Sequence, residues 1–239
     1  MTRRSLRVAR RYVAFALLAE LVLLALGRPS GRVVLATGLV SLLFFRDPER
    51  PPAERADTLY APADGVVTDV ATSVREPWLE AAEATRISTF LSLHNVHVTR
   101  SPVAGEIALA EEVEGGLRPA FLRASEENRR TRLAIDGEGG RVVLVQIAGM
   151  VARRITPWVG VRSHVRAGER VALIHFGSRA DVLVPAERVE VLVSRGDRVR
   201  AGVSPIARYH KKEEGSATNS GREYAHEGSV AGHSPEEGT

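Results

Sequence analysis

The chain has 239 residues, an apolar fraction of 44% and a formal net charge of +4, which is enough for one main domain with a substantial core. It contains no cysteine, which excludes disulfides, thiolate metal sites and a cysteine nucleophile, and we expect no metal site of another kind. Aromatic residues make up only 5% of the chain and no basic stripe is interleaved with them, so a nucleic-acid partner is not expected.

Two apolar runs open the chain, at residues 12–26 and 33–45, with a Gly/Pro-containing break between them. Arginines precede the first run, and Arg46 and Arg50 follow the second. Each run is shorter than the roughly 20 residues needed to cross a bilayer perpendicularly. The pattern favours a helical membrane-anchoring hairpin over residues 1–46, with both ends on the cytoplasmic side. Helices that lie on the membrane surface are an alternative, as is a secretory signal peptide, although no small-x-small cleavage site supports the latter.

Short alternating β-branched runs dominate from residue 47 to residue 209, as in 65–70, 141–147 and 188–193. Gly and Pro recur between the runs, which is typical of short strands joined by tight turns. This part of the chain is therefore predicted to be a mainly β sandwich or barrel. Residues 76–84 are expected to form a helical turn or a surface loop.

Two weak internal repeats refine this prediction. Residues 161–171 resemble 193–203, and residues 61–66 share a Pro-x-x-Gly-x-apolar pattern with 101–107. Glycine permits the turn in such units, and alternate valines face the core. The repeats predict a barrel-sandwich hybrid with the hammerhead pattern of lipoyl-like domains and a quasi-two-fold design.

Two segments are expected to lack regular structure. Residues 111–132 are polar and rich in Arg and Glu, which favours a mobile loop near the substrate entrance. Residues 210–239 contain almost no aliphatic side chains and cannot bury enough surface to offset their ordering entropy, so a disordered polar tail is predicted there.

Candidate chemistry is spread over three segments that contain Asp64, the pair His94 and His97, and the dipeptide Gly177-Ser178. An Asp, a His and a Ser form a triad by their roles rather than by their order in the chain. A serine that follows a glycine at the end of an apolar run is better suited to attack its own backbone than a substrate. No G-x-S-x-G elbow is present, which disfavours a conventional serine hydrolase.

Five motifs in order identify a family resemblance. They are Phe44-Phe45-Arg46-Asp47-Pro48-Glu49-Arg50, Ala61-Pro62-Ala63-Asp64-Gly65, the segment 95–102, the segment 146–155 and Phe176-Gly177-Ser178. Together they resemble the short-form phosphatidylserine decarboxylases, pyruvoyl-dependent proenzymes that cleave themselves at the Gly-Ser bond. The resemblance covers about residues 44–206.

The resemblance implies a self-processing reaction at Gly177-Ser178. Ser178 Oγ attacks the Gly177 carbonyl, His97 acts as the base, and Asp64 behind the imidazole fixes its tautomer. The resulting ester eliminates and the new chain loses ammonia, which leaves a covalent pyruvoyl group derived from Ser178. The products are a β chain of residues 1–177 and an α chain of residues 178–239, held together as a heterodimer.

The resemblance also implies the catalysed reaction. The pyruvoyl carbonyl forms a Schiff base with a serine phospholipid and serves as an electron sink while carbon dioxide leaves. His94 or His97 returns a proton to the α-carbon, and phosphatidylethanolamine is the product. The sequence does not distinguish phosphatidylserine from an archaeal-type serine ether lipid, and it leaves a homo-oligomer open. The implied location is the cell membrane, with the catalytic domain on the cytoplasmic side.

Arginines are the candidates for binding the lipid phosphate, because their planar guanidinium groups bind phosphate through two parallel hydrogen bonds. Arg153 and Arg154 are the first candidates. Arg179 is a third, and it stands with Asp181 beside the scissile turn, where the two are expected to orient it. His175 is expected to have no chemical role.

Two other classes of function compete with this one. A biotinyl or lipoyl carrier domain needs a lysine at a hairpin tip, but the only lysines are Lys211 and Lys212 in the polar tail. A non-catalytic, membrane-anchored β-domain that binds or scaffolds is excluded only by the set Asp64, His97 and Ser178. Self-cleavage separates the enzyme from both.

Overall fold

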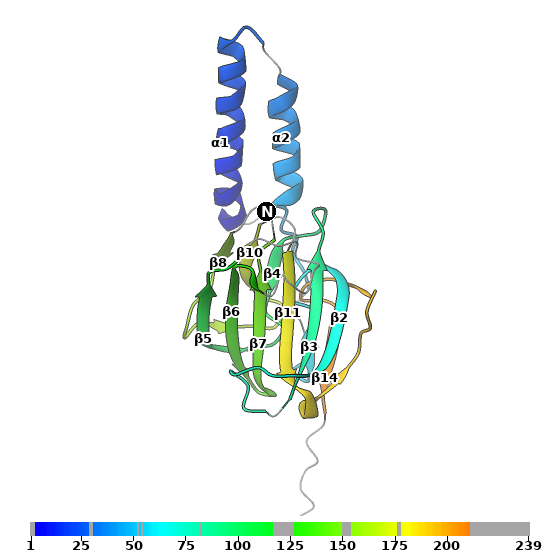
Figure 1. Ribbon diagram of the computed structural model, residues 1–239. Coiled ribbons are helices and arrows are strands. Elements are labelled where there is room, and N and C mark those ends of the chain that lie inside the picture. Colours follow the sequence, from blue (N-terminus) through cyan, green and yellow to red (C-terminus); the bar gives the residue numbers. More distant parts are fainter. Residues whose placement is uncertain are drawn as a thin grey trace, which may run out of the picture.

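The computed structural model describes residues 3–28, 31–51, 53, 55–81, 83–116, 127–149, 154–175 and 178–210. Two N-terminal helices, α1 (Arg3–Ala25) and α2 (Gly31–Phe44), lie side by side and project from one end of a β domain (Figure 1). Helix α1 ends where Gly27 adopts a left-handed conformation with φ of 70°, a common way to stop a helix. Among the described residues, neither helix is long and apolar enough to cross a membrane.

The β domain contains fourteen described strands. They are β1 (Thr58–Tyr60), β2 (Gly65–Val74), β3 (Ala84–Leu91), β4 (Val98–Arg100), β5 (Gly105–Val113), β6 (Arg130–Gly137), β7 (Gly140–Ile147), β8 (Ile155–Pro157), β9 (His164–Val165), β10 (Arg170–Ile174), β11 (Ser178–Pro185), β12 (Val189–Val191), β13 (Arg198–Val199) and β14 (Pro205–Tyr209). Between β11 and β12 lies a single 3₁₀ turn, Ala186–Arg188.

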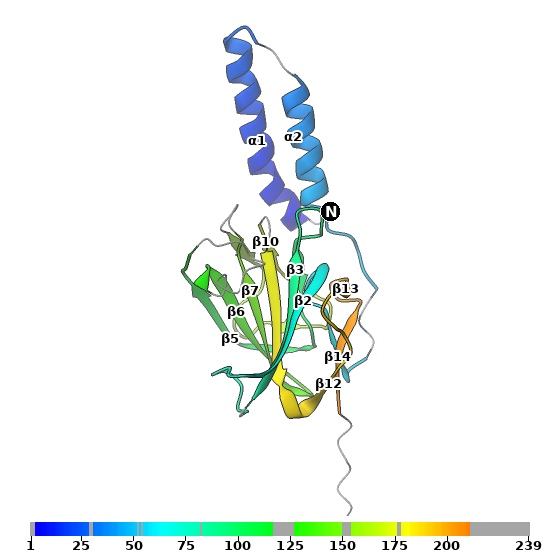
Figure 2. The same cartoon turned by 45° about the vertical axis from the view of Figure 1, so that its right-hand side comes forward.

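All strand pairs in the three sheets are antiparallel. The main sheet is curled and has the order β13-β2-β3-β11-β7-β6-β5-β9, and the two small sheets have the orders β1-β14-β12 and β4-β10-β8 (Figures 1 and 2). Strand β11 lies at the centre of the main sheet, with β3 on one side and β7 on the other. Its first residue, Ser178, therefore stands at the end of a strand that both neighbours hold in place.

The main sheet is buried on both faces around β11. On one face, Val182 and Val184 join the large core cluster, which also includes Ile87 and Leu144. On the other face, Leu183 packs in a second cluster with residues of the loop after β2, including Leu79. Burial on both faces explains why β11 is buried at every position instead of alternating, as a half-exposed strand would.

A quasi-two-fold relation appears in the backbone contacts of the two sequence repeats. Gly202 N donates to Ala61 O at 2.8 Å, and Gly168 N donates to Ser101 O at the same distance. Gly168 and Gly202 both adopt left-handed φ values, 76° and 67°. A Cβ on Gly202 would lie 2.8 Å from the Cα of Gly168, so the two repeats meet at a point that has no room for a side chain.

Most of the expected elements are confirmed. The strands predicted at 65–70 and 141–147 lie within β2 and β7, the one predicted at 188–193 is shortened to β12 because Arg188 belongs to the 3₁₀ turn, and residues 75–81 form turns without a helix. The loop predicted at 111–132 is too long at both ends, because β5 continues to Val113 and β6 starts at Arg130. The remainder of the predicted polar tail, residues 211–239, lies outside the described residues.

Candidate active site

Ser178 is the first residue of β11 and is fully buried. It lies opposite Leu91, the last residue of β3, so the loop that leaves β3 starts beside it. Its Oγ is buried and has no hydrogen-bond partner among the described residues. Leaving a buried hydroxyl unbonded costs about 1–3 kcal/mol. Gly177 lies outside the described residues.

His97 ends the same loop, just before β4, and is also fully buried. Its Nδ1 lies 2.9 Å from the carbonyl oxygen of Asn95. Because a carbonyl only accepts, Nδ1 carries the proton and Nε2 presents a free lone pair. Nε2 is buried and has no partner among the described residues. The ring is therefore held in the tautomer that a general base requires.

Burial also sets the charge of His97. Desolvation lowers the pKa of His97 to about 4, and the hydrogen bond to Asn95 opposes this shift only in part. The nearby positive charge of Arg46 lowers the pKa further. The imidazole is therefore neutral at physiological pH and able to accept a proton.

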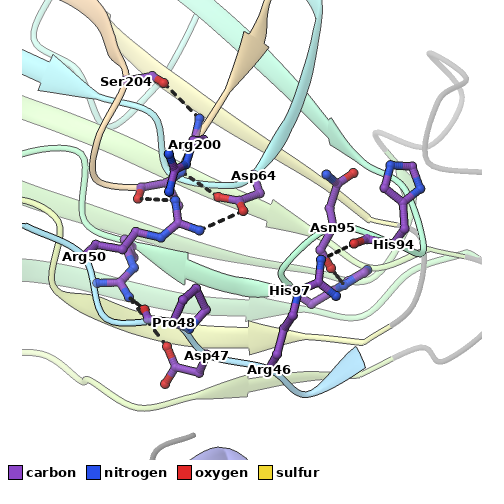
Figure 3. A network of polar contacts seen from close by, with 12 residues as sticks. Arg46, Asp47, Pro48, Arg50, Asp64, His94, Asn95, His97, Arg200 and Ser204 are labelled. Carbon is purple, nitrogen blue, oxygen red and sulfur yellow. Dashed lines mark hydrogen bonds and ion pairs between the residues drawn. The ribbon is translucent and has the colours of Figure 1, made fainter. Parts of the chain in front are cut away.

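Asp64 lies in the turn before β2, but its carboxylate is engaged by groups other than His97. Its Oδ2 accepts from Arg50 at 2.8 Å, and its Oδ1 accepts from the backbone N–H of Ala201 at 2.8 Å. Figure 3 shows Asp64 turned toward Arg50, with His97 beside Asn95 in another part of the view. The task of fixing the imidazole tautomer, which sequence reasoning gave to Asp64, is carried out by the Asn95 carbonyl. Asp64 acts on His97 through its charge, which raises the pKa of His97 slightly.

The segment after α2 contributes contacts that sequence reasoning missed. The Phe44 ring lies 4.2 Å from the His97 imidazole, centroid to centroid, and covers it. Phe45 lies 6.0 Å from the His175 ring, and Arg46 donates to the carbonyl oxygen of His94 (Figure 3). Both phenylalanines and Arg46 belong to the motif of residues 44–50, the first of the five that identify the family resemblance. Its two aromatic residues next to two arginines were the available signal of a role at the site.

His94 and His97 are separated by a tight turn, in which Asn95 N donates to Ser92 O at 2.9 Å. The turn leaves the His94 side chain exposed, with Ser92 Oγ 3.2 Å from its ring nitrogens, while His97 is buried. The two imidazoles therefore occupy different environments. Only His97 is enclosed, and only His94 is open to solvent.

His175 is a second buried imidazole, 2% exposed, two residues before the expected cleavage site. Its Nε2 lies 3.3 Å from Thr156 Oγ1, and its backbone N–H donates to the carbonyl oxygen of Arg154. Burial, and secondarily the charge of Arg154, lowers the pKa of His175 to about 4. It is a neutral side chain that packs between β8 and Phe45.

The arginine candidates differ in how they are engaged. Arg179 is 5% exposed and forms a bidentate ion pair with Asp181, with N–O distances of 2.8 and 2.6 Å. Such a pair inside β11 holds the strand end next to Ser178. Arg154 is exposed at the start of β8. Arg153 lies outside the described residues.

A groove of about 490 Å³ opens beside the predicted catalytic residues. Its lining includes Asp64, Ser92, His94, Asn95, Arg198 and Arg200. A larger cavity of about 800 Å³ is lined by residues such as Arg100, Trp158 and Tyr209 and by none of the predicted catalytic residues. The smaller groove is therefore the one that adjoins the candidate chemistry.

Comparison with known proteins assigns this arrangement to a family. The sequence profile described as phosphatidylserine decarboxylase matches residues 39–207. The chain belongs to the phosphatidylserine decarboxylase family. The match begins within α2 and ends within β14, so it includes the helix end that contacts His97 as well as the whole β domain.

Individual relatives agree with the family assignment. The phosphatidylserine decarboxylase proenzyme of Streptomyces coelicolor is 46% identical over 174 residues, covering 73% of this chain and 74% of the relative. That of Streptomyces griseus is 42% identical over 193 residues, covering 77% and 84%. A putative archaetidylserine decarboxylase proenzyme of Methanosarcina mazei is 40% identical over 176 residues, covering 73% and 78%.

The residues at the end of β11 fit the covalent pyruvoyl group that this family forms from a serine. Ser178 is buried and its Oγ is unbonded, so no other structural use of the hydroxyl competes with its conversion. The imidazole of His97 is neutral and also unbonded at Nε2.

Proposed function

We propose that Ser178, His97 and Asp64 carry the family's chemistry in this chain, which is a self-processing, pyruvoyl-dependent carboxy-lyase that converts a serine phospholipid to the ethanolamine lipid. The observation that carries the proposal is the pair of buried, unbonded polar atoms, Ser178 Oγ and His97 Nε2. Other buried side-chain atoms of the described residues also lack a partner, such as Thr89 Oγ1 and Tyr209 Oη, and what distinguishes this pair is that it combines a hydroxyl with the free lone pair of a neutral imidazole.

Maturation begins when His97 Nε2 takes the proton of Ser178 Oγ and the oxygen attacks the carbonyl carbon of Gly177. The protonated His97 passes its proton to the Ser178 nitrogen as the C–N bond breaks, and an ester replaces the amide. His97 then removes the α-proton of Ser178, the ester C–O bond breaks, and the residues up to Gly177 leave as a carboxylate. Addition of water releases the Ser178 nitrogen as ammonia. The chain divides into residues 1–177 and 178–239.

Once formed, the pyruvoyl group supplies the electron-accepting carbonyl that decarboxylation of an amino acid head group needs. The chain's own residues bind and orient the lipid and move protons. His94, which is exposed in the groove, is suited to deliver a proton to the α-carbon. Arg154, which is exposed just before β8, and Arg153 remain the candidates for binding the lipid phosphate, while the ion pair with Asp181 makes Arg179 an orienting group for the strand.

The β domain, residues 47–209, is assigned as a barrel-sandwich hybrid on the strength of the paired Gly168 and Gly202 contacts. The helical hairpin, residues 1–46, is assigned as the membrane anchor, with the catalytic domain on the cytoplasmic side. Many of its large apolar side chains are exposed, including Phe15 at 72%, Leu21 at 63% and Leu35 at 75%. An apolar surface of this kind marks a contact with lipid or protein. Residues 210–239 are assigned as a polar tail.

The activity is tested by supplying the purified full chain with carboxyl-labelled phosphatidylserine in mixed micelles and measuring released carbon dioxide. A parallel reaction with a serine ether lipid compares the two classes of backbone. Release from either lipid, and none with Ser178→Ala, is the expected result. No release from either lipid by a chain that has cleaved itself would contradict the proposed substrate while leaving the maturation intact.

A further inference from the structure

A buried polar contact links the main sheet to the small sheet that carries His97. Gln146 Nε2, in β7, donates to Thr99 Oγ1, in β4, at 2.6 Å. Thr99 Oγ1 donates in turn to the backbone carbonyl oxygen of Ala172, in β10, at 3.2 Å. Gln146 and Thr99 are both fully buried, and neither has a task in the chemistry described so far.

The hydroxyl of Thr99 fixes the orientation of the Gln146 amide. A hydroxyl has one proton, and that of Thr99 goes to the Ala172 carbonyl, which can only accept. Thr99 Oγ1 therefore accepts from Gln146, so the amide NH2 group faces Thr99. Gln146 Oε1 has no partner among the described residues, so the observed use of this side chain is its bond to the other sheet.

The strand register places Gln146 on the face of the main sheet that carries the Ser178 side chain. Gln146 is opposite Ala180 in β11, and opposed residues of antiparallel strands share a face. Ser178 precedes Ala180 by two residues and lies on that face as well. Diagonal neighbours of this kind are about 7–8 Å apart, within reach of a long side chain.

The pairing of β4 with β10 places the side chains of Thr99 and His97 on one face of the small sheet. Thr99 is opposite Ala172 in that pairing. Ile174 N donates to His97 O at 3.0 Å, which continues the same register by two residues. His97 therefore shares a face with Thr99, and Thr99 contacts Gln146, so this face is turned toward the main sheet.

Small and apolar side chains surround this contact on the small-sheet side. Ala148, two residues after Gln146, packs with Ala172 and Ile174. Apolar packing is non-directional, so it holds the two sheets together without fixing how far one has slid along the other. A hydrogen bond requires a short distance and an aligned donor, so the contact between Gln146 and Thr99 sets where β4 lies across β7.

We propose that Gln146 and Thr99 are positioning residues that hold the His97 imidazole in place for self-cleavage at Ser178. The proposal rests on the proposed function, because it takes His97 as the base and Ser178 as the nucleophile. A step of two residues leads from Thr99 to His97 on one sheet, and from Ala180 beside Gln146 to Ser178 on the other. Proton transfer needs hydrogen-bond reach, so a slip of about 1 Å between the sheets would cost roughly 10²-fold in rate.

The test removes both partners of the contact in Gln146→Leu/Thr99→Val. Apolar side chains of similar shape at both positions leave neither partner of the contact unpaired, so stability should change little. Self-cleavage is expected to slow by about 10–100-fold, because the alignment of the two sheets is lost. The matched control is Ser101→Ala, which removes a fully buried hydrogen bond within the same segment, from Ser101 Oγ to Val103 O at 2.6 Å. The control should cleave within about twofold of the wild-type rate.

Two single variants separate positioning from a loss of stability. Thr99→Ser keeps the hydroxyl and is expected to cleave at nearly the wild-type rate. Gln146→Met keeps the length of the side chain without its amide, and it is expected to cleave slowly even if the double variant does not fold. Gel electrophoresis over time measures the rates, and urea denaturation in the Ser178→Ala background measures stability. A folded double variant that cleaves at the wild-type rate would overturn the proposal, as would equal slowing in Ser101→Ala.

A spectroscopic readout distinguishes this proposal from the proposed function. In the uncut Ser178→Ala chain, the NMR signals of the His97 imidazole report its surroundings whether or not His97 is the base. They are expected to shift when Gln146→Met is added and to stay unchanged when Ser101→Ala is added. Unchanged signals with Gln146→Met would overturn the proposal even if His97→Ala fails to cleave. Shifted signals together with rapid cleavage of His97→Ala would leave the positioning of His97 standing and show that its proposed role as the base is wrong.

Discussion

The two halves of the candidate site differ in how their polar groups are satisfied. Around Asp64, both carboxylate oxygens are hydrogen-bonded, and the side chain of the partner Arg50, which is 3% exposed, has only its Nε buried without a partner among the described residues. Around His97 and Ser178, the two candidate reacting atoms themselves have no partner among the described residues. Leaving each unbonded costs about 1–3 kcal/mol, and such a cost persists where function requires it. We therefore expect the chemistry in the half whose reacting atoms are unsatisfied and scaffolding in the half that holds Asp64.

The largest expected effect comes from removing the base in the unsatisfied half. His97→Ala is expected to slow self-cleavage by about 10²–10⁴-fold, the usual contribution of a general base. His94→Ala is the matched control, because this imidazole is exposed, and it should cleave at nearly the wild-type rate while losing turnover. Gel electrophoresis over time after synthesis measures both. Rapid cleavage of His97→Ala would remove His97 from the mechanism.

Substitution of Asp64, in the satisfied half of the site, should mainly lower the stability of the fold. Asp64→Asn leaves the buried Arg50 guanidinium without its counter-charge, which is expected to destabilise the fold by about 3–5 kcal/mol. Chemical denaturation of Ser178→Ala, which keeps all proteins uncut, measures this loss against the same background.

The double variant Arg50→Gln/Asp64→Asn separates structure from catalysis. It removes both charges, so most of the lost stability is expected to return. If self-cleavage then remains slow in an otherwise wild-type chain, Asp64 acts on His97 through its charge. If cleavage also returns to the wild-type rate, Asp64 is a purely structural residue.

The pH dependence of stability should show the buried imidazoles. His97 and His175 have folded pKa values of about 4, below the ordinary value of 6.5. The unfolded chain therefore binds their protons first, and their contribution to stability is complete above about pH 6.5 and lost as the pH falls toward 4. Urea denaturation of Ser178→Ala at several pH values measures the slope, and a flat profile over this window would contradict the burial of both rings.

The smallest expected effect is a change in one pKa. Phe44→Ala uncovers the His97 ring and admits water, so the pKa of His97 should rise from about 4 toward 6.5. Phe44→Leu keeps the ring covered and should leave the pKa low. NMR titration of the imidazole in the Ser178→Ala background measures both variants. A low pKa in Phe44→Ala would show that the rest of the pocket is sufficient to exclude water.

The sequence predicted the strands better than it predicted the contacts of the candidate site residues. Alternating β-branched runs specify β2 and β7 locally, and the repeats around Gly168 and Gly202 specify a turn that only glycine fits. The hydrogen-bond partner of His97 could not be predicted in this way, because it is the backbone carbonyl of Asn95, and every residue type has a backbone carbonyl. The engagement of Asp64 by Arg50 likewise depends on how the segment after α2 crosses the domain, which no local pattern encodes.

Intact-mass spectrometry of the purified protein beside Ser178→Ala tests the central claim most directly. The account predicts two fragments from the wild type, divided between Gly177 and Ser178, with the second lighter by one ammonia than a peptide that begins with serine. It predicts a single chain from Ser178→Ala. An uncut wild-type chain in adequate lipid and detergent, or cleavage at any other bond, would contradict the assignment of Ser178 as the source of the pyruvoyl group.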